Sequence, residues 1–329
     1  MISTPVYLQI IVGFVLFAAI FATLEHKLPI RRQKILRRGW STDVKYFIAG
    51  CLAGQFSGAA SLTIIVLIGQ TTGLRFPQLA SHQPGWLQFL EILLLFDFLG
   101  YVFHRAMHKT AWLWRFHRIH HSSQEMDWLV NVRVHPVDKV LSDCFQIIPT
   151  LCLGFSPIPL LAFTIVLGVQ GFLIHSNLKL NYGPLRWIVA SPQFHHWHHS
   201  NDLKAHDKNF APHLVICDLL FGTARLPPSN AMPASYGVTD EVPEGFLPQL
   251  IHPFRRRHRG ELRRSFGPFF MTPAASPGRQ GDVSLPQSPI AAGPPVPLGS
   301  GGAAVRSNAE GAPVSNRHEA HNTTAGNCS

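Results

Sequence analysis

The sequence is short of charged residues. Asp, Glu, Lys and Arg together make up 14% of its 329 positions, against about 25% in an average soluble protein. Acidic residues are the scarcer kind, with 18 Asp and Glu against 28 Lys and Arg and a formal net charge of +10. Because 46% of the residues are hydrophobic, this deficit of charge indicates a chain that lies in a membrane.

Several common motifs are also missing, and each absence argues against a class of protein. The five cysteines form no Cys-x-x-Cys pair, so a disulfide framework is not expected. There is no Gly-x-Gly-x-x-Gly fingerprint for a flavin or nicotinamide, and no His-Glu-x-x-His zinc-protease motif. No Glu-x-x-His pair lies in the apolar segments, which argues against a carboxylate-rich four-helix di-iron bundle. The basic residues are not interleaved with a nucleic-acid-binding motif, so no nucleic-acid partner is expected.

The first long apolar run predicts a membrane-spanning helix. Residues 4–24 carry no charge, and about twenty such residues cross the hydrocarbon layer once. A cleaved signal peptide is the alternative, but its basic stretch would precede the apolar run. Here the basic stretch RRQKILRR, residues 31–38, follows the run. By the positive-inside rule this stretch lies in the cytoplasm and the N-terminus lies outside.

Three further apolar regions complete an all-α membrane bundle. Residues 44–69 predict a second crossing rich in small residues, and residues 86–103 predict a third that returns to the cytoplasmic side. Residues 139–175 are interrupted by GFSPIP at 154–159, which predicts a helical hairpin that begins and ends on that side. We therefore expect an integral membrane bundle of three crossings plus a hairpin, covered by a cytoplasmic helical cap.

The chain divides into three predicted regions. Residues 1–84 hold the N-terminal transmembrane helices and loops, residues 85–265 a catalytic domain with the cap, and residues 266–329 a disordered tail rich in Pro, Gly, Ala and Ser. The basic segment at 254–264 would suit either anionic lipid headgroups or a solvated surface.

Histidine is the residue in excess, with 19 copies. Eight of them fall in three groups with helical spacing, so that each group can share one face of a helix. The topology predicted above places all three groups at one membrane surface. They are His104 and His108; His117, His120 and His121; and His195, His198 and His199.

Eight imidazoles at one surface predict a metal site. Neutral imidazole is the commonest metal ligand and suits iron, zinc, copper or nickel. A structural zinc site takes four ligands, so eight or more indicate two metals. His175, at the end of the hairpin, and His135 are candidates for further ligands, and His196 and His206 are candidates for a place around the site.

Asp97 is an acid inside an apolar crossing, seven residues before His104. An acid at that depth is costly unless it is paired. It either supports a metal-bound histidine or pairs with another membrane-embedded polar group. Glu125, Asp138, Asp202 and Asp207 are other acids close to the histidine groups in sequence.

With these motifs in place, the chain resembles the fatty acid hydroxylase and sterol desaturase superfamily, the membrane histidine-box non-haem di-iron oxygenases. The resemblance covers roughly residues 85–225. The matching segments are HRAMH at 104–108, HRIHH at 117–121, HPVD at 135–138, HSN at 175–177, HHWHH at 195–199 and DLLFGT at 218–223.

The resemblance implies an oxidoreductase that uses O2 to attack an unactivated C–H bond of a lipid at two iron ions, with zinc as a substitute metal. It implies that the eight histidines of the three groups are ligands, and His175 matches an additional ligand of some members. No catalytic residue beyond the ligands and no other cofactor site is expected.

Reduction of O2 takes four electrons, of which the substrate supplies two. An external donor, such as a cytochrome or a ferredoxin with its reductase, would supply the rest. The site would face the cytoplasm, from a bacterial inner membrane or the endoplasmic reticulum.

The reaction and two other classes of function stay open at this point. Hydroxylation leads, but desaturation or ether cleavage would use the same ligands. A histidine-rich membrane metal transporter would need ligands deep inside the crossings, whereas these lie at their ends. A membrane zinc hydrolase would work without O2 or a reductant. The substrate lipid is also open: a sterol, fatty acyl chain, carotenoid, ether lipid or sphingolipid.

Overall fold

The computed structural model describes residues 6–76, 78–227, 231–239 and 241–255, and these belong to one compact unit, Met1–Ser276. The predicted tail at 266–329 and most of the basic segment at 254–264 lie outside the described residues. The helices are α1 (Val6–Lys27), α2 (Trp40–Thr72), α3 (Gly85–Lys109), α4 (Ala111–His117), α5 (Pro136–Leu153), α6 (Pro157–His175), α7 (Pro192–His198), α8 (Ile216–Leu220) and α9 (Phe246–Ile251). Short 3₁₀ helices lie between them: η1 (His120–Ser122), η2 (Trp128–Val132), η3 (Gly183–Trp187), η4 (Leu203–Ala205) and η5 (His252–Phe254). Within the described ranges the fold is helical, with three isolated β-bridges and no strands.

Four described helices, α1, α2, α3 and α6, are long and apolar enough to cross a membrane. Lipid favours helices here because every backbone polar group is then satisfied inside the segment. The three predicted crossings are confirmed as helices, although α2 and α3 extend beyond the predicted 44–69 and 86–103. The extension of α3 to Lys109 carries His104 and His108 on its last two turns.

The predicted hairpin is present as α5 and α6, which meet at a short turn over residues 154–156. Gly154 ends α5 with φ +70, a conformation that glycine adopts without strain. Pro157 then starts α6, where its missing N–H is not needed. Only the α6 arm is apolar enough to span a membrane, because α5 carries Asp138, Lys139 and Asp143.

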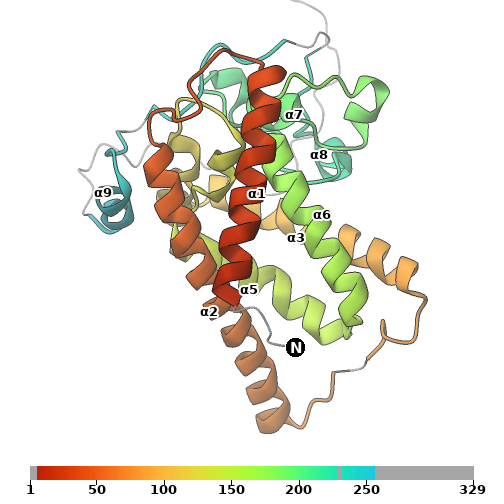
Figure 1. Cartoon of the computed structure of the whole chain (residues 1–329). Helices are drawn as coiled ribbons and strands as arrows, with labels where there is room; N and C mark the ends of the chain where they lie inside the picture. The colour runs from red at the N-terminus through yellow and green to blue at the C-terminus, as the bar shows by residue number, and fades with distance from the viewer. Residues whose placement is uncertain (1–5, 77, 228–230, 240, 256–329) are drawn as a thin grey trace, which may run out of the picture. The chain divides into compact units, whose positions relative to one another are not determined.

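Packing between helices brings the N-terminal and C-terminal parts of the fold together. α2 packs on α5, and α3 packs on α5 and α6. An aromatic cluster joins α1, η2 and α6, with Phe21 5.9 Å from Trp128 and 6.0 Å from Phe172 between ring centroids. Figure 1 shows the long helices beside one another, with α7 and α8 near the end of the molecule where α1 finishes. The long helices therefore form a base for the shorter segments that carry most of the histidines.

Candidate metal centre

Nine histidines converge into two adjacent groups. Five ring nitrogens, from His104, His108, His117, His121 and His198, form the group that we name site A. Four more, from His120, His175, His195 and His199, form site B. Within each group the candidate donor atoms lie within 4.8 Å of one another. The two groups touch, because the rings of His121 and His199 stack with centroids 4.3 Å apart.

The second and third histidine groups of the sequence each contribute to both sites. His117 and His121 belong to site A, whereas His120 between them belongs to site B. His198 likewise belongs to site A, while His195 and His199 belong to site B. The expectation that each group points in one direction therefore needs refining. At about 100° per residue, positions i and i+4 nearly align, whereas i+3 points well to the other side.

Local sequence signals start the segments that hold these rings. α7 begins with Ser191, whose hydroxyl accepts the N–H of Phe194, followed by Pro192 at the first helical position. Between α4 and η1 the chain turns within two residues, so His117 ends one helix and His120 opens the next. His175 is the last residue of α6, and this placement brings it beside His195, with 2.9 Å between their Nε2 atoms.

Hydrogen bonds on the outer nitrogen orient most of the rings. In five of the nine rings the Nδ1–H donates to an acceptor, which leaves the Nε2 lone pair facing inward. The acceptors at site A are Phe210 O for His104 at 2.8 Å, Asp138 Oδ2 for His117 at 2.8 Å and Lys208 O for His198 at 2.7 Å. Those at site B are Arg133 O for His120 at 3.3 Å and Gly171 O for His175 at 2.7 Å.

The inward nitrogens fit a transition-metal ion. Neighbouring Nε2 atoms lie 2.9–3.2 Å apart, as in His117–His121 and His195–His199. Adjacent nitrogens of an octahedral ion bound at about 2.1 Å would lie about 3.0 Å apart. The buried Nε2 atoms of His104 and His198 have no hydrogen-bond partner within the described chain. Inward nitrogens at this spacing, two of them without a partner, are the donor set that a metal ion would use.

Burial keeps the cluster neutral. It lowers the pKa of the imidazoles well below 6.5, and the neighbouring imidazoles lower it further. A neutral ring keeps the lone pair that a metal needs, so the surroundings prepare the rings for ligation at neutral pH. The residues so affected outside the membrane-spanning helices are His120, His121, His195, His198 and His199.

A strained loop supplies two of the carbonyl acceptors. Asp207 and Asn209 have φ of 57° and 59°, values that non-glycine residues seldom adopt. The buried Asp218 carboxylate accepts the N–H groups of Phe210 and Ala211 at 3.0 and 2.7 Å and so holds the loop in place. Burial raises the pKa of Asp218 to about 6. The role of Asp218, which lies in the DLLFGT segment, is visible only in three dimensions.

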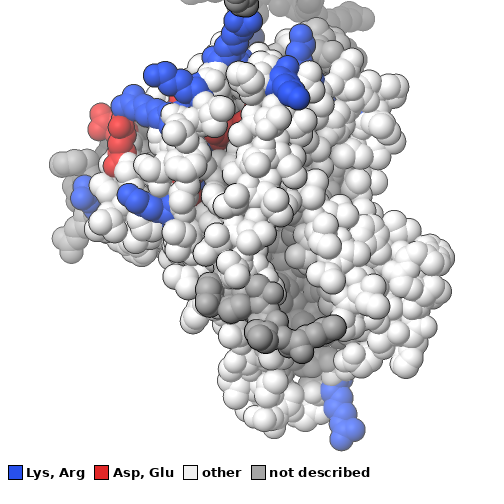
Figure 2. All heavy atoms as spheres, viewed as in Figure 1, with Lys and Arg blue, Asp and Glu red and all other residues white. Residues whose placement is uncertain are grey.

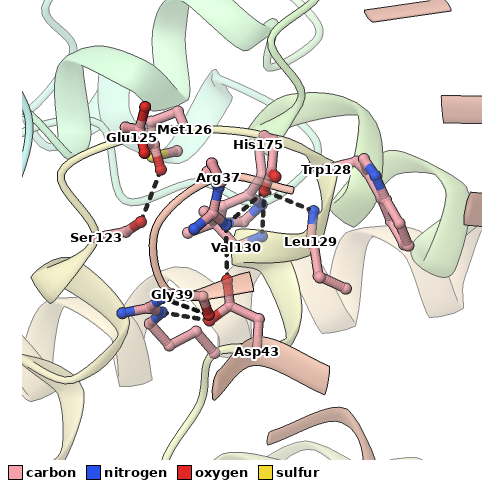
Figure 3. A network of polar contacts seen from close by, with 12 residues as sticks. Arg37, Gly39, Asp43, Ser123, Glu125, Met126, Trp128, Leu129, Val130 and His175 are labelled. Carbon is pink, nitrogen blue, oxygen red and sulfur yellow. Dashed lines mark hydrogen bonds and ion pairs between the residues drawn. The ribbon is translucent and has the colours of Figure 1, made fainter. Parts of the chain in front are cut away.

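A buried ion network holds the site-B acceptor Arg133. Arg37 Nη2 lies 2.7 Å from Asp43 Oδ2 and 2.6 Å from Asp127 Oδ1, and Arg133 Nε lies 2.5 Å from Asp43 Oδ1. Figure 3 shows the side chains of Arg37 and Asp43 within this network. Asp127 also accepts the N–H groups of Leu129 and Val130 and so caps η2. The network joins the start of α2 to the segment whose carbonyl orients His120.

Four predicted candidates lie outside the two groups. His135 caps α5 by accepting the N–H of Val137, and its Nε2 bonds to Leu250 O at 3.0 Å. His196 bonds to Tyr236 Oη at 2.8 Å and to the carbonyl of Ser176 at 3.0 Å, so it steadies the chain just after His175. His206 lines the cavity beside site A. Asp97 accepts the backbone N–H groups of His213 and Leu214, both at 3.0 Å, and among the described residues it forms no hydrogen bond to a clustered ring.

A cavity of about 170 Å³ opens beside site A. Its walls include the site-A residues His108, His121 and His198. Lys109 and Asp207 form an ion pair of 2.8 Å at its edge, and Ser200 and Thr239 add polar groups. The cavity therefore joins a partly polar lining to three of the site-A histidines.

Fold and site together define a multi-pass membrane protein with a histidine-rich metal centre at the end of its long helices. The fatty acid hydroxylase family model matches residues 89–223. Ornithine lipid hydroxylase OlsE of Rhizobium tropici is 35% identical over 254 residues, which cover 74% of this chain and 75% of that protein. The chain belongs to the fatty acid hydroxylase family.

Other relatives cover a smaller share. Alkylglycerol monooxygenase of Xenopus tropicalis is 34% identical over 175 residues, 52% of this chain and 37% of that protein. Human cholesterol 25-hydroxylase is 29% identical over 165 residues, 46% of this chain and 58% of that protein. No solved structure matches the chain.

Family membership makes the chain a membrane oxidoreductase of the lipid-hydroxylase type, with a lipid and O2 as reactants and a non-haem iron type of centre. The transporter and zinc-hydrolase alternatives gain no support from these relatives.

Proposed function

We propose that the chain hydroxylates a membrane lipid at two iron ions, one in site A and one in site B. The observation that carries this proposal is the division of nine histidines, eight of them buried, into two touching groups of five and four. Each group has enough nitrogens for one ion, and no carboxylate belongs to either group. Iron, when bound, supplies the activation of O2.

In this proposal the chain contributes geometry and exclusion of water. The carbonyls of Phe210, Lys208 and Gly171 and the carboxylate of Asp138 hold the rings so that their lone pairs converge. Hydroxylation consumes one C–H bond, one O2, two electrons and two protons and yields an alcohol and water. An external one-electron carrier, such as a cytochrome or a ferredoxin with its reductase, supplies the two electrons.

We further propose that the site faces the cytoplasm. The connection between α1 and α2, on the histidine side, contains Arg31, Arg32, Lys34, Arg37 and Arg38, whereas the connection between α2 and α3, residues 73–84, contains Arg75 alone among Lys and Arg. Figure 2 shows Lys and Arg gathered at the end where α1 finishes, above a largely uncharged surface. By the positive-inside rule, this unequal distribution of Lys and Arg supports a cytoplasmic location for the end of the molecule that carries the histidine sites.

For the substrate, we propose a lipid with a polar, amino-acid-containing headgroup. OlsE is named as an ornithine lipid hydroxylase. The partly polar cavity at site A, with its Lys109–Asp207 pair, suits a zwitterionic group better than a bare acyl chain. An ornithine lipid is therefore the first substrate to test.

The test uses purified protein loaded with ferrous iron, a chemical reductant, ornithine lipid and ¹⁸O2. Hydroxylation predicts a product heavier by one ¹⁸O atom, detected by mass spectrometry, and no product without O2. Desaturation would remove two hydrogens and incorporate no ¹⁸O. The His120→Ala variant should give no product, whereas His82→Ala, which changes an exposed histidine of the 73–84 connection, should match the wild type. An unlabelled product, or activity without O2, would contradict the proposal.

A further inference from the structure

A second pocket, of about 480 Å³, lies where α1 leaves the membrane-spanning region. Its walls come from the last two turns of α1, from Pro29 and residues 31–35 of the following segment, and from Trp128 and Asn177. We name residues 28–38 the basic strap. The pocket shares no lining residue with the cavity at site A, so it is a separate feature of the fold.

The pocket is lined by cations that lack acidic partners. Lys27, Arg32 and Lys34 are exposed, and none of them forms an ion pair with an acid among the described residues. Glu25 is the one acid of the lining, and its Oε1 is turned into the wall, where it accepts the N–H groups of Trp128 at 2.8 Å and Asn177 at 2.9 Å. The open side of the pocket is therefore positive and suits an anion.

Asn177 holds the basic strap in place before any ligand arrives. The N–H of Ile30 donates to the Asn177 carbonyl at 2.8 Å, and the N–H of Arg31 donates to its Oδ1 at 3.0 Å. The Asn177 amide donates in return to Arg31 O at 2.7 Å. Arg31 also lies 4.6 Å over the ring of Tyr236 and bonds to Pro233 O. A pocket built in this way needs little ordering on binding.

The strap has the composition of a segment at the membrane surface. Leu28, Ile35 and Leu36 are 51%, 58% and 65% exposed, and in the sequence they lie on either side of the exposed cations Arg32 and Lys34. Apolar side chains of this kind enter the lipid, while Lys and Arg extend toward the headgroups. α1 ends at Lys27, so the pocket lies at headgroup depth in any membrane that α1 spans. The anion that meets it there is a lipid headgroup.

We propose that this pocket binds the phosphate headgroup of an anionic membrane lipid, at a position separate from the histidine site. Cations next to an anionic membrane surface each strengthen binding about fivefold. Loss of Arg32 and Lys34 together should therefore weaken binding about 25-fold. The charge at this end of the molecule is visible in Figure 2.

The experiment counts lipids bound to the detergent-purified full chain by native mass spectrometry. Dioctanoyl phosphatidylglycerol is titrated against dioctanoyl phosphatidylcholine. The Arg32→Gln/Lys34→Gln variant is compared with Lys45→Gln/Arg75→Gln, which removes the same charge from exposed residues outside the pocket. All proteins are first required to elute as one species with equal melting temperature. Lys27→Gln is a second, single change in the pocket, with an expected loss of about fivefold.

We expect the wild type and the control to prefer phosphatidylglycerol, and the pocket variants to lose that preference. Equal binding by wild type and pocket variant, or no preference in the wild type, overturns the proposal. Displacement of the lipid by inorganic phosphate at the same concentration would assign the pocket to a soluble anion and also overturn it. The measurement needs no metal, O2 or turnover, so its outcome is independent of the proposed hydroxylase activity.

Discussion

The contact between Asp138 and His117 offers the sharpest test of how the chain prepares its metal centre. The carboxylate accepts the Nδ1–H of His117 at 2.8 Å, and both side chains are less than a tenth exposed. The site-A rings of His104 and His198 donate instead to the backbone carbonyls of Phe210 and Lys208. A buried, charge-assisted hydrogen bond of this kind fixes the ring and raises its basicity as a ligand.

Removal of such a partner costs about 10- to 100-fold in metal affinity, or about 1.4–2.8 kcal/mol. We expect Asp138→Ala to approach the upper value, because His117 then loses its acceptor inside the protein. Asp138→Asn should lie near the lower value, since the amide oxygen still accepts but carries no charge. The loss of metal affinity should affect site A, because His117 belongs to that group alone.

The assay is iron content by elemental analysis after dialysis against a graded series of chelator concentrations. The matched control is Asp143→Asn on the same helix, whose carboxylate pairs with Lys139 and Ser57 rather than with a histidine. Asp138→Ala should lose about half of its metal at chelator concentrations that leave wild type and control intact. Retention of full metal content and activity by Asp138→Ala would refute the argument that this carboxylate prepares His117.

Further predictions concern the two sites, the ion network and pH. His108→Ala should remove the metal of site A and His175→Ala that of site B, so each should lower iron content from about two to about one ion per chain; loss of both ions in either variant would contradict independent sites. Asp43→Asn should lower the free energy of unfolding by about 3–5 kcal/mol, because Arg37 and Arg133 lose a buried partner; an unchanged melting temperature would be inconsistent with the network. Since burial depresses the pKa of the clustered imidazoles below 6.5, the folded state binds fewer protons than the unfolded state. Stability and metal retention should therefore fall as pH drops from about 7 toward 5. A metal content that stays constant over this range would contradict the predicted pH dependence.

Much of the membrane base was predictable because lipid imposes a simple rule. A largely apolar run of about twenty residues in lipid has to form a helix, and the runs at 4–24, 44–69 and 86–103 do so in α1, α2 and α3. The hairpin was predictable from GFSPIP, since glycine ends a helix and proline starts one. α5 is less apolar than the other long helices because it carries three charged residues. The sequence prediction treated residues 139–175 as one apolar region and so did not separate this arm from α6.

The histidine groups were predictable as groups, but their division between two sites was not. Spacing alone shows that His117, His120 and His121 are near one another, yet the 3₁₀ turn at η1 decides which way each ring points. The acceptors at Phe210, Lys208 and Gly171 are backbone carbonyls, which any residue type supplies, so no sequence pattern marks them. Asp97 was a reasonable candidate by its spacing, but its Oδ1 accepts the backbone N–H groups of His213 and Leu214 instead of a clustered ring.

The interleaving of the two sites has a consequence for how the centre is assembled. Because η1 holds His120 next to His121, and α7 holds His198 next to His199, neither site can be arranged without moving rings of the other. A displacement of η1 or of α7 should therefore disturb both sites at once, whereas the loss of a single ring, as in His108→Ala or His175→Ala, should disturb one site.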